Sequence, residues 1–356
     1  MNCSYCIGDD ERDIVAAQKV LQKIFMIISR TPLRISFVGG GSDIQSFYKH
    51  HKGAVVSTAI NKYIYIAVNG QFDGRIIIQY SKTEIVKRIK DIENNLVREA
   101  LKMVGIKNGI HITSVADIPS EGSGMGSSSS YLVGLLNALY AFKGKHVTAE
   151  QLARQACKIE IDILKKPIGK QDQYIAAYGG FQYMQFNQDG TVFVDPIICL
   201  SDTKNILKKN MLLFYTGITR SADPILAVQS RKMATEIHKR KTMLDMVHLA
   251  EKMRKDLFAN HIDSFGEALH KNWLLKKSMA ESISTKQIDT WYEKARKVGA
   301  IGGKLLGAGG GGFFLFYADQ KYHKKIIKNL SDLHYVPFSF EPQGSKIIFI
   351  DTGIDL

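Results

Sequence analysis

The sequence contains few cysteines and prolines, and it has no long run of apolar residues. Four cysteines in 356 residues are too few for the disulfide framework of a small secreted domain. Cys3 and Cys6 form one C-x-x-C pair without the second pair that a structural zinc site requires, so we interpret them, like Cys157 and Cys199, as reduced thiols. No apolar stretch approaches the roughly 18 residues of a membrane span, so no membrane-spanning helix is predicted.

The first 25 residues also lack the pattern of a secretion signal. They carry four acidic side chains where a signal peptide would carry basic and then apolar residues. Apolar residues between 11 and 25 recur at the spacing of an amphipathic helix. Because the stretch from Met26 reads like the start of a compact domain, we interpret residues 1–25 as an appended segment and expect a cytoplasmic protein.

Basic residues outnumber acidic ones, 48 Lys and Arg against 34 Asp and Glu, which gives a formal net charge of +14. A positive surface favours anionic partners such as nucleic acids, acidic membranes or phosphorylated small molecules. The sequence has no RNP motif, no zinc-finger spacing and no helix-turn-helix signature beside an aromatic-rich basic stripe. We therefore expect a phosphorylated small molecule as partner, with neither nucleic acid nor membrane, and the sequence leaves a homodimer open.

Hydrophobic residues at 45% and charged residues at 23% are typical of a globular chain with room for two domains. The apolar patterns predict an α+β fold. Strands are expected at residues 33–38, 63–68, 75–80, 109–115, 192–194, 211–215, 313–317 and 346–351. Helices are expected at residues 84–104, 127–142 and 148–165, followed by a helix-rich region over 222–298. This change of composition predicts a boundary near residue 200, between domains of residues 26–200 and 201–356.

The most informative segment is a glycine- and serine-rich loop between a predicted strand and the helix at 127–142. Gly122, Gly124 and Gly126 let the backbone approach a ligand closely and adopt positive φ. Ser127–Ser130 follow at the helix N-terminus, where free N–H groups favour an anion. A plain helix cap would need fewer glycines and serines. No Lys follows as in a Walker loop, and the next element is a helix where a dinucleotide fold would have a strand. The segment therefore predicts a phosphate cradle of another kind.

Two further motifs make the chain similar to a known family. The loop contains GMGSSS, residues 30–43 read RTPLRISFVGGGSD, and residues 304–313 read KLLGAGGGGF. In this order they resemble the three motifs of the GHMP kinases, the superfamily of galactokinase, homoserine kinase, mevalonate kinase and phosphomevalonate kinase. The resemblance implies the GHMP kinase fold. Its N-terminal α/β domain is of the ribosomal protein S5 domain 2-like type, and its C-terminal α+β domain is ferredoxin-like.

Within this superfamily, the first motif and GKQDQ at residues 169–173 are most similar to bacterial D-glycero-D-manno-heptose 7-phosphate kinases. The resemblance implies ATP and Mg²⁺ as cofactors, with Ser128 and Glu160 as metal ligands. Glu160 lies beside the apolar face of the predicted helix at 148–165, where a carboxylate is either paired or recruited by a metal. The resemblance implies that ATP is bound by Gly122, Gly124, Met125, Gly126, Ser127, Ser128 and Ser129.

The resemblance also implies roles for residues at the transfer site. Asp172, expected in a polar turn, matches the aspartate that acts as catalytic base or orients the acceptor hydroxyl. Arg34 matches an arginine that stabilises charge on the transferred phosphoryl group, and a structural salt bridge is the alternative. Asp43 matches the aspartate that binds sugar hydroxyls. Gly40 and Gly41 stand where galactokinases carry Glu-His, which weakens galactose as the substrate.

A substrate that already carries a phosphate needs a cationic clamp of its own. Lys170, Arg220 and Lys304 are candidates, and Lys304 could equally reach ATP. The glycine run that includes Gly309 is expected to pass close to the substrate and to the nucleotide cradle.

Together these features predict an ATP- and Mg²⁺-dependent kinase that converts D-glycero-α-D-manno-heptose 7-phosphate into the 1,7-bisphosphate by phosphorylating its anomeric hydroxyl. The product would feed a pathway of nucleotide-activated heptose for cell-surface glycans. The alternatives are a fucokinase- or galactokinase-like sugar 1-kinase, a catalytically silent sugar or nucleotide sensor on the same fold and, more distantly, a dinucleotide-dependent oxidoreductase.

Overall fold

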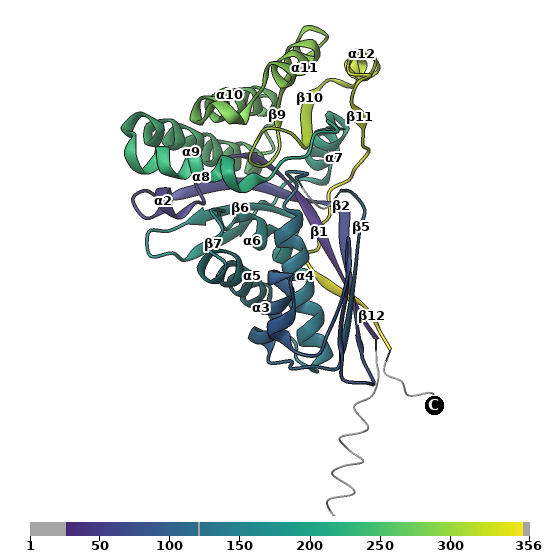
Figure 1. Cartoon of the computed structure of the whole chain (residues 1–356). Coiled ribbons are helices and arrows are strands. Elements are labelled where there is room, and N and C mark those ends of the chain that lie inside the picture. The colour runs from purple at the N-terminus through teal and green to yellow at the C-terminus, as the bar shows by residue number, and fades with distance from the viewer. Residues whose placement is uncertain (1–25, 120–121, 352–356) are drawn as a thin grey trace, which may run out of the picture.

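The computed structural model describes residues 26–119 and 122–351 (Figure 1). The helix expected within residues 1–25, with Cys3 and Cys6, therefore lies outside the described residues. The strands are β1 (Met26–Val38), β2 (Gly53–Gly70), β3 (Ile76–Gln79), β4 (Thr83–Val86), β5 (Ile110–Ala116), β6 (Phe181–Phe186), β7 (Val192–Pro196), β8 (Met211–Tyr215), β9 (Ala300–Leu305), β10 (Phe313–Ala318), β11 (His334–Tyr335) and β12 (Lys346–Ile350).

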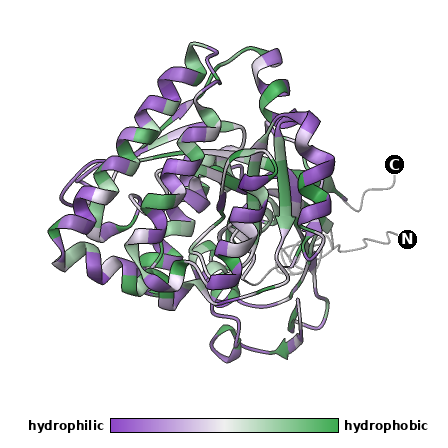
Figure 2. Ribbon diagram, turned by 90° about the horizontal axis from the view of Figure 1, so that it is seen from above, coloured by the Kyte–Doolittle hydropathy of each residue, from purple (hydrophilic) through white to green (hydrophobic). Residues whose placement is uncertain are grey.

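The helices join these strands into an α+β architecture, which confirms the predicted fold class. They are α2 (Gln45–Tyr48), α3 (Asn95–Val104), α4 (Ser127–Phe142), α5 (Ala149–Cys157), α6 (Gln171–Tyr178), α7 (Ser201–Lys209), α8 (Ala222–Thr235), α9 (Ile237–Phe258), α10 (Phe265–Met279), α11 (Lys286–Lys297) and α12 (His323–Asn329). Single turns lie at Ile89–Asp91, Glu281–Ile283 and Gln320–Tyr322, and a π-helix at Lys158–Ile163 continues α5. Figure 2 shows hydrophilic and hydrophobic residues side by side on many of these helices.

The first sheet has eight strands, and most of them follow the order β12-β1-β2-β5-β3-β4. The long strand β2 pairs with β1 over residues 56–69, and its two halves also pair with β6 and with β5. Residues 31–38 of β1 are all buried, because α4 and α6 cover this part of the sheet. This continuously buried run fixes the strand that carries the side chains of Arg34 and Ser36.

The second sheet has the order β11-β8-β10-β9 and is covered by the helices of the C-terminal half (Figure 1). Its core is aromatic: Phe314 of β10 packs edge-on against Trp273 of α10 and stacks with Phe316. The last strand, β12, returns to the first sheet and pairs antiparallel with β1. The division of the chain at residue 200 stays a prediction.

Three expectations of local structure need correction. The helix predicted at 84–104 is a helix only from Asn95, because residues 83–86 form β4 and pair with β3. The helix predicted at 148–165 changes from α to π geometry at Lys158. Asp172 lies in the first turn of α6 and not in a turn between elements. No helix among the described residues is long and apolar enough to cross a membrane.

Candidate active site

Arg34 and Asp172 form a two-bond ion pair between β1 and α6. Arg34 Nε and Nη2 donate to the two carboxylate oxygens of Asp172 at 2.7 and 2.8 Å. Arg34 is almost fully buried, and its Nη1 also donates to the carbonyl of Gly124 at 2.5 Å. The guanidinium therefore fixes the Asp172 carboxylate beside the glycine- and serine-rich loop, with further lone pairs on both oxygens still able to accept a proton. The structure brings the two predicted catalytic residues together.

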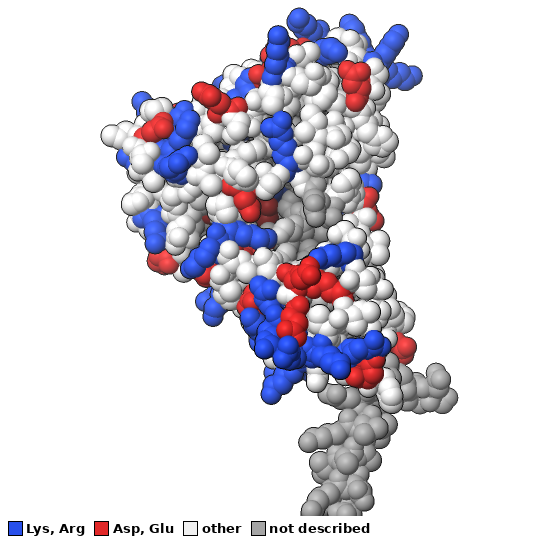
Figure 3. All heavy atoms as spheres, in the orientation of Figure 1, with Lys and Arg blue, Asp and Glu red and all other residues white. Residues whose placement is uncertain are grey.

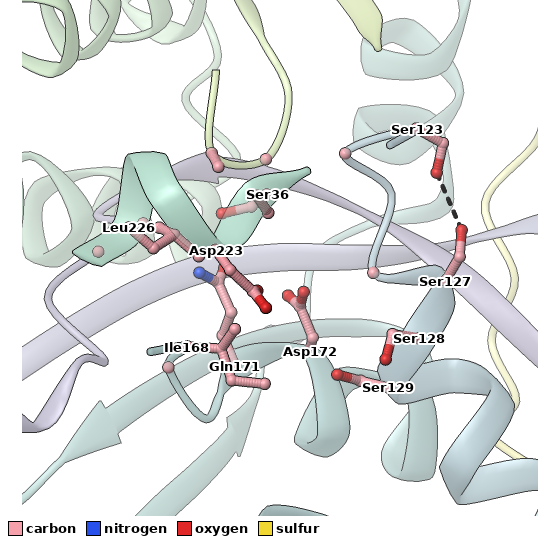
Figure 4. Close-up of a pocket in the computed structure, with 18 of the residues that line it drawn as sticks. Ser36, Ser123, Ser127, Ser128, Ser129, Ile168, Gln171, Asp172, Asp223 and Leu226 are labelled. Carbon is pink, nitrogen blue, oxygen red and sulfur yellow. Dashed lines mark hydrogen bonds between the residues drawn. The ribbon is translucent and has the colours of Figure 1, made fainter. Parts of the chain in front are cut away.

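The glycine- and serine-rich loop has the backbone geometry that its sequence predicts. Gly122, Gly124 and Gly126 all have positive φ, between 64° and 76°. Gly126 precedes α4, whose first intrahelical hydrogen bond runs from the N–H of Ser130 to the carbonyl of Gly126. The N–H groups before Ser130 have no partner within the helix and are free for an anion. Figure 4 shows the serines at the start of α4, with the hydrogen bond of 2.9 Å between Ser123 and Ser127.

The second glycine run packs against this loop, backbone to backbone. A Cβ atom on Gly124 would lie 2.5 Å from the carbonyl oxygen of Leu306, and one on Gly307 would lie 2.5 Å from the Cα of Gly124. A Cβ atom on Gly312 would lie 2.4 Å from the carbonyl oxygen of Ser123. Contacts this close exclude any side chain at these positions. The glycine run therefore packs directly against the loop that is predicted to bind the nucleotide.

Glu160 is fully buried and is held by four donors. Its carboxylate accepts hydrogen bonds from Ser128 Oγ, Ser129 Oγ and Gln173 Nε2, each at 2.7 Å. The ammonium of Lys166 lies 3.1 Å from Glu160 and 3.0 Å from Ser128 Oγ, so a cation already fits between them. Carboxylate and hydroxyl oxygens are the ligands that Mg²⁺ prefers.

No group of three or more His, Cys, Asp or Glu side chains in the described part of the chain could hold a metal ion. Mg²⁺ nevertheless fits the Ser128–Glu160 pair, because it is commonly held by one or two carboxylates together with substrate phosphates.

Asp43 follows β1 and is buried against α6. Its carboxylate accepts hydrogen bonds from the N–H of Gly41, the N–H of Gln171 and the side chain of Gln171. Burial, reinforced by the charge of Asp172, raises the pKa of Asp43, while the N–H donors oppose this rise. A Cβ atom on Gly169 would lie 1.9 Å from Asp43 Oδ2, so glycine at 169 is required to seat this carboxylate.

These groups line one cavity of about 490 Å³ (Figure 4). Most predicted site residues reach it: Arg34, Gly40, Gly41, Asp43, Gly122, Gly124, Gly126, Ser127, Ser128, Ser129, Glu160, Asp172, Arg220 and Lys304. This volume is typical of a small-molecule site. The exposed Arg220 stands at its rim, whereas Lys304 is 5% exposed and donates to the carbonyl of Phe37 at 3.1 Å. Burial lowers the pKa of Lys304 well below its usual value, and nearby Lys276 and Arg34 lower it further.

Three predicted residues do not line this cavity. Lys170 donates to the carbonyl of Gly190, lies over the ring of Tyr48 and lines a separate hollow, because its place just before α6 directs it away from Asp172. Met125 has its side chain fully buried in the core, and its backbone accepts from the N–H of Arg34 and donates to Ser123 Oγ. Gly309 packs on the backbone of Ile283, so it is Gly307 and Ala308 that face the cavity.

Other lining residues were missed by the sequence analysis. They are Ser36, Lys166, Gln171, Asp223 and Lys276. Figure 4 shows Asp223 of α8 pointing into the same cavity as Asp172. A signal for Lys276 existed in its position, because it continues the apolar stripe of Leu269 and Trp273 along α10. A lysine on such a stripe is either paired or functional.

Comparisons with known proteins agree with this geometry. The model of the GHMP kinases N terminal domain matches residues 78–180, and that of the GHMP kinases C terminal matches residues 253–335. The chain is 32% identical to the D-glycero-alpha-D-manno-heptose 7-phosphate kinase of Campylobacter jejuni, over 90% of this chain and 98% of that protein.

Two solved structures are also similar. The crystal structure of a D-glycero-D-manno-heptose 1-phosphate kinase from Bacteroides thetaiotaomicron has a TM-score of 0.75 and 25% identity, and the match covers 91% of this chain and 99% of that one. A putative sugar kinase from Campylobacter jejuni has a TM-score of 0.73 and 28% identity, covering 90% and 98%. With both halves of the family matched and its three glycine motifs around one cavity, the chain belongs to the GHMP kinases and is an ATP-dependent sugar kinase.

Proposed function

We propose that this kinase transfers the γ-phosphoryl group of ATP to the anomeric hydroxyl of D-glycero-α-D-manno-heptose 7-phosphate. The product would be the 1,7-bisphosphate, an intermediate on the way to nucleotide-activated heptose. The similarity to a heptose 7-phosphate kinase over almost the whole chain supports this substrate. The observation that carries the chemistry is the Arg34–Asp172 pair, which lies in one cavity with the Ser128–Glu160 pair.

In this reaction the acceptor oxygen bonds to the γ-phosphorus while the bond to the bridging oxygen of ADP breaks. Asp172 orients the acceptor hydroxyl and takes its proton as the new bond forms. Arg34 holds Asp172 in place and sets a positive charge beside the transferred group. The free N–H groups at the start of α4 bind the triphosphate. Mg²⁺, which Ser128 and Glu160 would hold, neutralises charge on the phosphates when it is bound.

Asp43 is the group proposed to read sugar hydroxyls. It lies on the same wall of the cavity as Asp172 but is turned toward Gly41 and Gln171. Gly40 and Gly41 carry no side chains, so the sugar in this kinase lacks the Glu-His contacts of galactokinases.

The test is ATP consumption with Mg²⁺ on five acceptors: heptose 7-phosphate, heptose 1-phosphate, free heptose, L-fucose and galactose. The position of the new phosphate is read by ³¹P NMR of the product. We expect turnover on the 7-phosphate with a new phosphate at C1. Turnover only on the 1-phosphate or on a free sugar would overturn the proposed acceptor and leave the sugar kinase in place. ATP binding without turnover on any acceptor would instead favour a sensor.

A further inference from the structure

Two lysines lie buried in the cavity without a carboxylate partner. Lys276 of α10 is 6% exposed and Lys304 of β9 is 5% exposed. Their ammonium groups donate to neutral oxygens, the side-chain carbonyl of Gln229 at 2.9 Å and the backbone carbonyl of Phe37 at 3.1 Å. Among residues 26–119 and 122–351, no carboxylate forms a salt bridge with either lysine. Each ammonium has three N–H donors, so most of their hydrogen-bonding capacity is unused.

Neighbouring side chains add further donors without acceptors. Gln229 Nε2 and Asn272 Nδ2 are buried and have no hydrogen-bond partner in the described structure. The orientation of both amides is fixed, because Gln229 Oε1 accepts from Lys276 and Asn272 Oδ1 accepts from the N–H of Gly39. Buried polar groups in proteins nearly always find partners. An anion with several acceptor oxygens would satisfy N–H donors of this group that have no partner in the described structure.

The distribution of charged side chains in the cavity also favours a bound anion. Arg34 is paired with Asp172, and Lys166 with Glu160. Asp43 is the carboxylate whose charge acts on Lys276, whereas the charges that act on Lys304 are those of Lys276 and Arg34. Asp43 already accepts three hydrogen bonds from Gly41 and Gln171. Burial, together with the charge of Arg34, lowers the pKa of Lys276 to about 8, while Asp43 acts in the opposite direction. Two ammonium groups in such surroundings are costly unless an anion compensates them.

The glycine loop after β1 packs directly against these donors. A Cβ atom on Gly41 would lie 2.5 Å from Gln229 Nε2 and 3.5 Å from Lys276 Nζ. Any side chain at 41 would therefore push Gln229 and Lys276 out of their positions. The loop contributes backbone only, and Asp43, the proposed reader of sugar hydroxyls, follows two residues later.

We propose that Lys276 and Lys304, which both line the cavity, bind the phosphate that the acceptor sugar already carries. This assignment rests on the proposed function, since it needs an acceptor that is itself a phosphate ester. The triphosphate of ATP has donors of its own in the glycine- and serine-rich loop, whereas Lys276 lies beside Gly41 and is acted on by the charge of Asp43. Lys304 donates to Phe37, at the end of β1 that leads to Gly41, and its charge acts together with that of Lys276. In this proposal the phosphate clamp consists of the two buried lysines. Of the other candidates from the sequence, Arg220 stands at the rim of the cavity and Lys170 points away from it.

The experiment measures dissociation constants by calorimetry for heptose 7-phosphate, free heptose and a non-hydrolysable ATP analogue. The variants are Lys276→Met and Lys304→Met, with Lys271→Met as the control, an exposed lysine on the same helix α10. Removing a charged hydrogen bond to phosphate should weaken binding of the 7-phosphate about tenfold to a hundredfold. Free heptose, the ATP analogue and the control variant should keep wild-type affinity.

Two results would overturn the assignment while the proposed function stands. Equal losses for phosphorylated and free heptose would mean that the lysines bind hydroxyls or support the fold. A loss confined to the ATP analogue would mean that the anion is the phosphate of the nucleotide.

The melting temperature of the Lys276→Met variant distinguishes a ligand-binding lysine from one that stabilises the fold. Because methionine replaces an unpaired buried charge with an apolar group of similar length, Lys276→Met should raise the melting temperature of the ligand-free protein. A lower melting temperature would assign Lys276 to the fold and overturn the proposal.

The proposed function can fail independently. If the wild type binds both sugars equally, the acceptor is wrong, and inorganic phosphate then tests the site alone. With ADP and Mg²⁺ occupying the nucleotide loop, phosphate should raise the melting temperature of wild type and Lys271→Met but not of Lys276→Met. Equal shifts in all three would overturn the anion site.

Discussion

At the scale of single residues, the proposed mechanism depends on the ion pair of Arg34 and Asp172. We expect Asp172→Asn to lower kcat by about a hundredfold or more, because the amide cannot take the proton of the acceptor hydroxyl. Binding of the ATP analogue should stay at the wild-type level, since the donors at the start of α4 are untouched. Steady-state kinetics and calorimetry on the same preparations check both statements. A variant with unchanged kcat would remove Asp172 from the transfer step.

Lys166 invites a prediction of a different kind. Its ammonium bridges Ser128 and the buried Glu160, the pair that would hold Mg²⁺. Lys166→Met leaves Glu160 without a counter-charge, so the ligand-free protein should melt at a lower temperature than wild type. Added Mg²⁺ should then stabilise the variant more than the wild type, because no ammonium competes for the carboxylate. Thermal melts across a magnesium titration measure this difference, and identical shifts in both proteins would contradict it.

At the scale of elements, helices that depend on local sequence were predicted well, whereas strand β4, which depends on pairing with β3, was not. The helix predicted at 127–142 is α4 to the residue, because its glycine entry and apolar run are both local. The helix predicted at 84–104 was wrong at its start, since residues 83–86 pair with β3 and pairing overrides local preference. The loops that form the phosphate cradle were predictable from their glycines. The burial of Lys276 was not, because it depends on how α10 packs over β9.

The contact between the two glycine loops gives a prediction for the nucleotide site. Alanine at Gly124 would combine an unfavourable positive φ of 73° with a Cβ atom 2.5 Å from the carbonyl of Leu306. We expect Gly124→Ala to raise KM for ATP more than KM for the sugar, since the cradle must shift. Gly144→Ala is a matched control: its φ is 67° and its Cβ would meet nothing within 4 Å. Equal effects of the two variants would show that backbone strain alone, and not the loop contact, is responsible.

At the scale of the whole molecule, the cavity is assembled from both halves of the chain. The phosphate cradle, Asp43 and Asp172 come from elements around the first sheet, whereas Lys276 and Lys304 come from α10 and β9. On the face that Figure 3 shows, Lys and Arg side chains lie among Asp and Glu over α3 and α5. The composition therefore indicated an anionic partner, but which basic side chains would bind it follows only from the tertiary fold.

The protonation of Lys276 makes the stability of the folded protein depend on pH. In the folded protein its pKa is lowered to about 8, whereas the unfolded chain keeps the ordinary value of 10.5. Between these values the unfolded chain binds more protons, so the contribution of Lys276 makes the free energy of unfolding rise with pH. The groups that face it are Asp43, Arg34 and Lys304, and of these only Asp43 favours its protonation.

A bound phosphate reverses this preference, because the dianion stabilises the ammonium form of Lys276. Affinity for heptose 7-phosphate should therefore fall as pH rises above about 8, by up to about tenfold per pH unit for one linked proton. Calorimetry near pH 8 in buffers of different ionisation enthalpy should detect proton uptake by the wild type. Lys276→Met should lose that uptake while Lys271→Met retains it. If the affinity of the wild type for heptose 7-phosphate is constant from about pH 7 to 9, the sugar phosphate does not contact a lysine that titrates in this range, and Lys276 is not part of the phosphate site.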